Sequence, residues 1–240
     1  MRNSPARVIA IADPMAVEGK APFQTRFAPK DVSTPCYTYY KIFGDLTDTT
    51  KIPLLVLHGG PAAGHEYLLG LHTLAEQVIF YDQLGCGQST DLPEKHGDKD
   101  FWTEALFCSE LSNLMEHLGL RNRRIDLLGH SWGGMLAVGW VSAFCTFTPT
   151  SNIRRLILYG VPASMELHVQ GLAKVREGLP QDVQEALQHG LDIQDYTSPE
   201  FQNAMLVFCK RHLSLSSPFP IDEIAPALAR MAGSEVHRTM

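Results

Sequence analysis

The sequence around Ser131 has the residue types that a serine nucleophile requires. An apolar run, 125–128, predicts a buried strand, and the pentapeptide 129–133 (Gly-His-Ser-Trp-Gly) separates it from the helix-like stretch 135–144. A serine between two glycines in a sharp strand-to-helix turn is typical of a nucleophile elbow, in which strained backbone geometry exposes the hydroxyl. The helix N-terminus would also favour negative charge at this position. The alternative is a Gly-rich turn without chemistry.

A second Gly-rich stretch could supply the rest of an oxyanion hole. The segment 58–61 (His-Gly-Gly-Pro) directly follows the apolar run 53–57. In acyl transfer by serine, one oxyanion donor is the backbone N–H of the residue after the nucleophile, and another comes from the loop after an earlier strand. We therefore predict that Trp132 and Gly60 supply these two N–H groups. Either motif alone could be an ordinary turn, but both in these positions favour a catalytic site.

The elements that must position these motifs alternate between strand and helix. Continuous apolar runs predict strands that are covered on both faces, and apolar residues at helical spacing predict the helices between them. This alternation predicts an α/β fold with a doubly wound, mostly parallel sheet and right-handed crossovers. The expected strands are 8–12, 36–43, 53–57, 78–81, 125–128 and 156–159, the first two forming an antiparallel hairpin, and the expected helices are 66–77, 101–120 and 135–144.

The pattern changes after Pro162, where helical stretches follow one another without strands. We predict a core domain over residues 1–162 and a helical lid over residues 163–240, covering the carboxyl ends of the strands where ligands bind in open α/β folds. The expected helices of this lid are 164–179, 181–189, 199–213 and 221–231, with a loop at 190–198.

Composition excludes several function classes. The chain has 26 acidic and 20 basic residues and no basic stripe, which argues against nucleic acid as a partner. It has no apolar run of about 18 residues and no recognisable secretory signal, so we expect a cytoplasmic protein without a membrane partner. The 5 cysteines are widely spaced and form no C-x-x-C pair, which predicts free thiols and no zinc. Gly85-x-Gly87 lacks the third glycine of a dinucleotide fingerprint.

Taken together, these motifs resemble the proline iminopeptidases, serine aminopeptidases with the α/β-hydrolase fold. The fungal members are most similar, especially through 101–103 and 131–135. The resemblance implies that Ser131 forms an acyl-enzyme while releasing an N-terminal residue, often proline, from a small peptide or amino-acid amide. It implies no metal and no organic cofactor, and the oligomeric state stays open. The matching segments are 58–61, 65–68, 81–90, 129–134, 198–204, 210–213 and 237–240.

The resemblance also predicts which parts of the family pattern this chain lacks. Family members continue beyond the stretch that matches 237–240 and carry there the triad Asp and His, the Glu residues that bind the substrate's amino group, and the last strands of the sheet. We therefore expect a chain truncated at its C-terminus, without a recognisable base. Ala62 also replaces the glycine that usually ends the His-Gly-Gly-Pro-Gly motif.

Nearby residues are weak substitutes for the missing base. His130 adjoins Ser131, but neighbours across a sharp elbow usually point apart. His58 is expected to hold the oxyanion loop, and Asp82 to tie its own turn through backbone N–H groups. Two other functions therefore stay open beside the aminopeptidase: a catalytically inactive binding protein of the same fold, and a hydrolase or cyclising enzyme that acts on a non-peptide amide or ester in a biosynthetic pathway.

Overall fold

The structure, a computed structural model, describes residues 16–24, 27–29, 32–145 and 152–240. It divides into a sheet unit, Met1–Val161 with Ala227–Met240, and a helical unit, Pro162–Pro226. The sequence prediction divided the chain after residue 162 and placed the last 14 residues with the helical segment, whereas the structure groups these residues with the sheet unit. The physical reason is burial, because Val236 is 3% exposed and packs in the core of the sheet unit.

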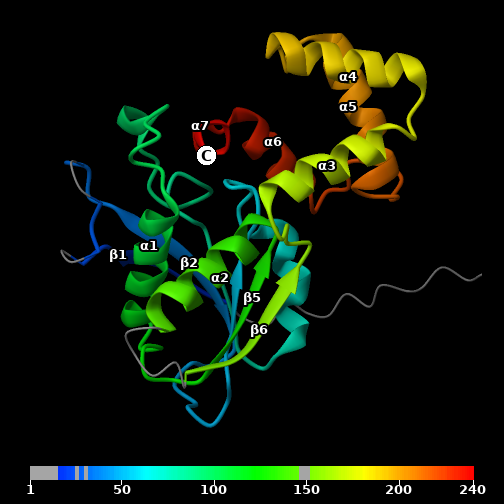
Figure 1. Cartoon of the computed structure of the whole chain (residues 1–240). Helices are drawn as coiled ribbons and strands as arrows, with labels where there is room; N and C mark the ends of the chain where they lie inside the picture. The colour runs from blue at the N-terminus through cyan, green and yellow to red at the C-terminus, as the bar shows by residue number, and fades with distance from the viewer. Residues whose placement is uncertain (1–15, 25–26, 30–31, 146–151) are drawn as a thin grey trace, which may run out of the picture. The chain divides into compact units, whose positions relative to one another are not determined.

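The sheet unit is built on a six-stranded sheet of order β1-β2-β4-β3-β5-β6 (Figure 1). Pairing is parallel from β4 through β3 and β5 to β6, and antiparallel from β1 through β2 to β4. This confirms the doubly wound, mostly parallel sheet. The hairpin partner of β2 is β1, whereas the strand expected at 8–12 lies outside the described residues. The strands are β1 Val17–Pro22, β2 Tyr37–Phe43, β3 Leu54–Leu57, β4 Val78–Tyr81, β5 Ile125–His130 and β6 Ile153–Tyr159.

Both faces of the sheet are covered, which explains the continuous apolar runs. Successive side chains of a strand point to opposite faces, so β3 and β4 each contribute to two separate cores. Leu55 and Tyr81 pack with α1 (Glu104–His117) and α2 (Trp132–Cys145). Val56 and Phe80 pack with the 3-10 helix η1 (Glu66–Leu74), which forms where the sequence predicted an α-helix. A short 3-10 helix, η2 (Pro93–Lys95), precedes α1.

The central strand β3 brings the two Gly-rich motifs together. It lies between β4 and β5 and pairs parallel with both, so the strand order reverses there. Leu57, the last residue of β3, is in register with Gly129 near the end of β5. The loop after β3 and the turn after β5 therefore emerge side by side at the carboxyl edge, the place where open α/β sheets bind ligands.

The helical unit has its own small core. It contains α3 (Met165–Arg176), α4 (Gln181–Ile193) and α5 (Pro199–His212), while α6 (Ala225–Gly233) crosses the boundary and α7 (Glu235–Thr239) lies in the sheet unit. Helix α4 extends into the stretch predicted as a loop and ends where Gln194 adopts a left-handed conformation. None of the described helices is long and apolar enough to cross a membrane. The buried core residues of this unit are Leu179, Val183, Ala186, Leu187, Phe201 and Ala204.

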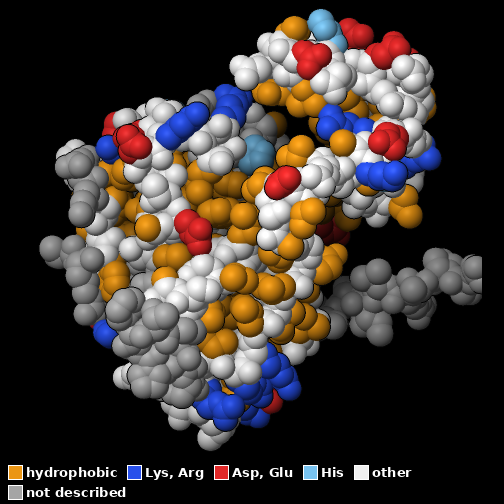
Figure 2. Space-filling view, viewed as in Figure 1, with side chains coloured by type: hydrophobic (Ala, Val, Ile, Leu, Met, Phe, Trp, Pro, Cys, Tyr) orange, Lys and Arg blue, Asp and Glu red, His pale blue; other side chains and the backbone are white. Residues whose placement is uncertain are grey.

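Strand β6 is the edge of the described sheet, and its apolar side chains are accessible. Leu158 is 47% and Tyr159 is 65% exposed. Figure 2 shows hydrophobic side chains gathered over this strand. An open strand edge presents unpaired backbone groups as well as apolar area, which is the part of a sheet that other chains can pair with.

A buried carboxyl group lies between α1 and the strands. Glu110 is fully buried, with Oε1 2.7 Å from the hydroxyl of Thr38 in β2, while Oε2 accepts from the backbone N–H of Leu84 at 3.0 Å. Burial raises the pKa of the Glu110 carboxyl to about 8. The hydrogen bonds that Leu84 and Thr38 donate act to lower this pKa, but the burial of the carboxyl group outweighs them.

This carboxyl group predicts a pH-dependent stability. An unfolded glutamate titrates near ~4.3, so between that pH and about 8 the folded state keeps a proton that the unfolded state releases, and the free energy of unfolding falls by about 1.4 kcal/mol per pH unit as pH rises. Glu110→Gln keeps both contacts and cannot ionise. In urea denaturation, the free energy of unfolding of the variant relative to that of the wild type should increase from about pH 5 to about pH 8. The exposed Glu104→Gln in the same helix is the control, and a parallel pH dependence of both variants would contradict the prediction.

Candidate active site

The turn around Ser131 has the predicted elbow geometry. Strand β5 ends at His130 and α2 begins at Trp132, so Ser131 alone makes the turn, with φ at 52°. A non-glycine residue in the left-handed region is strained, and such strain is concentrated at functional sites. Ser131 is only partly buried. The backbone segments before and after Ser131 approach each other so closely that a Cβ at Gly129 would overlap the backbone of Gly133.

The loop after β3 lies directly against this elbow. A Cβ at Gly133 would overlap the carbonyl oxygens of Leu57 and His58, so α2 begins in backbone contact with the end of β3. Gly60 in the same loop has φ at 120°, a conformation available to glycine and strained for other residues. Ala62 takes a left-handed φ of 75° where the family motif has glycine. The structure therefore brings the three predicted site residues, Ser131, Trp132 and Gly60, to one edge of the sheet.

His58 holds the loop of Gly60 through hydrogen bonds, as predicted. Its ring is fully buried, with Nδ1 2.9 Å from the carbonyl oxygen of Gly59 and Nε2 3.0 Å from the backbone N–H of Gln83. A ring that donates through Nδ1 and accepts through Nε2 is the neutral tautomer. Burial lowers the pKa of His58, which is consistent with that form. Both ring nitrogens are engaged, so the ring has no free nitrogen with which to accept a proton from Ser131.

Tyr67 joins the same loop to His130. The backbone N–H of Gly59 donates to the Tyr67 hydroxyl at 2.8 Å, and that hydroxyl lies 2.6 Å from Nδ1 of His130. Since the hydroxyl accepts from Gly59, its own proton is available to the ring nitrogen. Burial lowers the pKa of His130, which favours the neutral ring that can accept it. The Gly59 N–H is therefore occupied, and the neighbouring Gly60 remains as the candidate oxyanion donor.

Asp82 ties the loop after β4 to η1. Its carboxylate lies 2.8 Å from Nδ1 of His65 and also accepts the backbone N–H groups of His65 and Gln88, both at 2.9 Å. Burial acts to raise the pKa of Asp82, but the hydrogen bond from His65 and the neighbouring charges outweigh it and the pKa is lowered. As predicted, Asp82 binds backbone groups of its own turn. Its bond to the His65 side chain was not predicted.

Two groups of residues in the described part of the chain have the spacing of metal ligands. They are His58, Asp82 and Cys86, and His65, Glu66 and Asp82. The Glu66 carboxylate is already paired with both terminal nitrogens of Arg230 in α6, at 2.6 and 2.9 Å. With the imidazoles also engaged by protein partners, the donor set fits internal hydrogen bonding rather than metal coordination.

The structure brings no base to Ser131 within the described residues. Its side-chain hydroxyl makes no hydrogen bond to a histidine there, and His130 points to Tyr67 instead. His237 of α7, which the sequence analysis assigned to the lid, lies in the sheet unit and hydrogen-bonds to the Pro61 carbonyl. Its buried Nδ1 has no partner in this part of the structure, and burial lowers its pKa.

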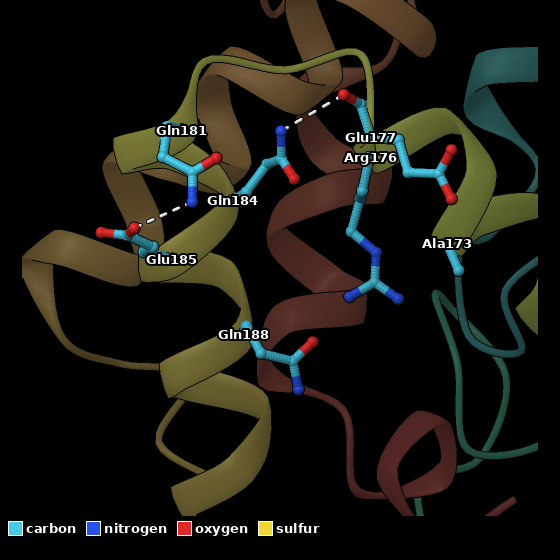
Figure 3. A pocket seen from close by; sticks show the side chains of 7 residues that line it. All are labelled: Ala173, Arg176, Glu177, Gln181, Gln184, Glu185 and Gln188. Atoms are coloured by element: carbon cyan, nitrogen blue, oxygen red, sulfur yellow. Dashed lines mark hydrogen bonds between the residues drawn. The ribbon is translucent and has the colours of Figure 1, made fainter.

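A surface pocket of about 400 Å³ lies in the helical unit between α3 and α4 (Figure 3). Two of its polar side chains are held by local bonds, Gln181 to the Glu185 carboxylate at 2.9 Å and Gln184 to the Glu177 carbonyl at 3.2 Å. None of the predicted site residues lines this pocket, and it holds no nucleophile. Its lining residues are Ala173, Arg176, Glu177, Gln181, Gln184, Glu185 and Gln188.

The sequence of the chain matches known proteins of one family. A family model described as the alpha/beta hydrolase fold matches residues 52–235. The proline iminopeptidase of Lactobacillus delbrueckii subsp. lactis is 37% identical over 203 residues, which cover 83% of this chain and 65% of the relative. That of Clostridium botulinum is 39% identical over 178 residues, covering 73% of this chain and 57% of the relative. The chain thus spans less than two thirds of the length of these relatives.

Solved structures give the same relationship. The crystal structure of VinJ matches with a TM-score of 0.80 and 35% identity, covering 93% of this chain and 70% of VinJ. The crystal structure of the Mycobacterium smegmatis proline iminopeptidase matches with a TM-score of 0.72 and 30% identity, covering 92% of this chain and 70% of that chain.

The elbow generates a stability prediction. Gly133→Ala should lower the free energy of unfolding by more than about 2 kcal/mol, because the new methyl group overlaps backbone carbonyls that cannot move without disturbing β3. Thermal denaturation would measure it. Gly70→Ala in η1 is the matched control, since no atom lies within 4 Å of its Cβ position, and it should change stability by less than about 1 kcal/mol. Equal effects of the two substitutions would contradict this account of the elbow.

Proposed function

Because the chain belongs to the α/β-hydrolase fold family, among its proline iminopeptidase-like members, we propose that it is a serine hydrolase that removes an N-terminal residue, often proline, from a small peptide or amino-acid amide. The observation that supports this most is the strained Ser131 at the head of α2, next to the loop of Gly60. Strain is retained where the surrounding structure imposes it, and here the Gly129–Gly133 contact does so.

The proposed reaction uses backbone groups for charge stabilisation. The Ser131 oxygen attacks the carbonyl carbon of the scissile bond while its proton passes to a base, and the carbonyl oxygen becomes an oxyanion. The N–H groups of Gly60 and Trp132 stabilise this oxyanion, assisted by the N-terminus of α2. The C–N bond then breaks, the amine leaves with a proton, and water hydrolyses the acyl-enzyme. We assign no base, because no described histidine is bonded to Ser131.

The first test is the hydrolysis of proline 4-nitroanilide by the purified protein. We expect turnover that falls by at least about 10³-fold in Ser131→Ala, because the nucleophile is indispensable to acyl transfer. Ser109→Ala is the matched control, since this serine is in α1 and its hydroxyl donates to the Ala105 carbonyl one helical turn away. Release of 4-nitroaniline is followed by absorbance.

The outcomes separate the three possible functions. No turnover from folded wild-type protein would contradict the aminopeptidase and favour the catalytically inactive binding protein. Turnover of 4-nitrophenyl acetate that depends on Ser131, without turnover of proline 4-nitroanilide, would favour the hydrolase of non-peptide substrates. Turnover that survives in Ser131→Ala would show that the reaction occurs elsewhere in the protein.

A further inference from the structure

Gln83 connects the two backbone segments that carry the candidate oxyanion donors. Its backbone N–H donates to Nε2 of His58 at 3.0 Å, and its side-chain Nε2 donates to the carbonyl oxygen of the same residue at 3.1 Å. Its Oε1 accepts from the indole N–H of Trp132 at 2.9 Å. One buried side chain, 1% exposed as a residue, thus binds both the loop of Gly60 and the first residue of α2.

The chemistry of the partners leaves only one orientation for this amide. The indole N–H of Trp132 is a donor and can meet only the amide oxygen. The His58 carbonyl is an acceptor and can meet only the amide nitrogen. Glutamine is therefore the residue type that satisfies both partners at once, whereas an ionised carboxylate would face the His58 carbonyl with no proton to donate.

The backbone on either side of Gln83 is itself fixed. Asp82 donates its N–H to the Tyr39 carbonyl at 3.0 Å, and its carboxylate holds His65 and the later part of the same loop. Leu84 donates its N–H to the buried carboxyl group of Glu110. Anchored residues on both sides give Gln83 a rigid base, which a group needs if it is to hold others within a fraction of an ångström.

We propose that Gln83 is the positioning residue that sets the distance between the N–H groups of Gly60 and Trp132. The geometric part of this proposal stands on the three hydrogen bonds alone, and its catalytic consequence rests on the proposed function. Since the oxyanion exists in the tetrahedral intermediates and not in the bound substrate, a misplaced donor lowers kcat while substrate binding is retained. The Gln83 side chain hydrogen-bonds to His58 and Trp132, and Gln83 acts through these two residues.

The decisive variant is Gln83→Glu, because its protonation state selects the interaction. A protonated glutamate can donate to the His58 carbonyl and accept from Trp132, as glutamine does, whereas the ionised form loses the donor. Burial favours the protonated form and brings the titration toward neutral pH. We therefore expect the ratio of variant to wild-type kcat on proline 4-nitroanilide to recover as the pH is lowered. Gln83→Ala should lose about 10- to 100-fold in kcat at every pH, with KM within about threefold.

A matched control exists at the opposite end of β4. Gln77 is 2% exposed and holds backbone carbonyls, among them that of Asp48 at 2.9 Å, but no element of the candidate site. Gln77→Ala should therefore destabilise the fold through the same loss of buried hydrogen bonds, with kcat and KM close to those of the wild type. A merely structural role of Gln83 would give the two alanine variants the same kinetics at matched fractions of folded protein.

A spectroscopic readout keeps the proposal testable even without turnover. The readout is the position of two signals in ¹H–¹⁵N spectra, the Trp132 indole and the Gly60 amide. In Gln83→Glu, both signals should lie near their wild-type positions at low pH and should move to the positions of Gln83→Ala at high pH. In the control Gln77→Ala, both signals should stay at their wild-type positions. Signals that do not move in either Gln83 variant would overturn the proposal. Moving signals in a protein that never hydrolyses proline 4-nitroanilide would uphold the positioning role and refute the proposed function instead.

Discussion

The structure depends on one close backbone contact, that between the start of α2 and the end of β3. Parallel pairing sets Leu57 beside Gly129, and Gly133 then lies so close to the carbonyls of Leu57 and His58 that no side chain fits. Together with the contact between Gly129 and Gly133, this contact holds Ser131 in its left-handed φ, and it sets where the loop of Gly60 begins. Because a packed backbone has little freedom to relax, the same constraint that costs conformational energy also orients the nucleophile.

Side chains extend this contact into a continuous polar network. Each neighbour of Ser131 is joined to the loop of Gly60 through one intermediate residue: His130 through Tyr67 to Gly59, and Trp132 through Gln83 to His58. In a site of low dielectric, hydrogen bonds of this kind are strong when every group is satisfied and costly when one is lost. The network therefore couples the position of the loop to that of the elbow without using the reacting atoms.

All three predicted site residues belong to one of the two units. The sheet unit contains Ser131, Gly60 and Trp132, together with α7, whose His237 contacts the loop of Gly60 at Pro61. The pairing of Arg230 in α6 with Glu66 adds a second tie from the C-terminal segment to η1. The chain spans 65% of the Lactobacillus relative, and the proposed chemistry needs a base that the described residues do not bring to Ser131.

Local pattern in the sequence was sufficient for the strands β3, β4 and β5, the helix α1 and the elbow, because apolar periodicity and paired glycines are short-range signals. It also led to the family, through motifs that keep their order. Tertiary structure alone decided the rest: the return of 227–240 to the sheet unit, the pairing of β1 with β2, and the contacts of Tyr67 and Gln83. Their partners lie 63 and 49 residues away along the chain. No local pattern encodes such contacts, since they exist only after the sheet has brought distant strand ends together.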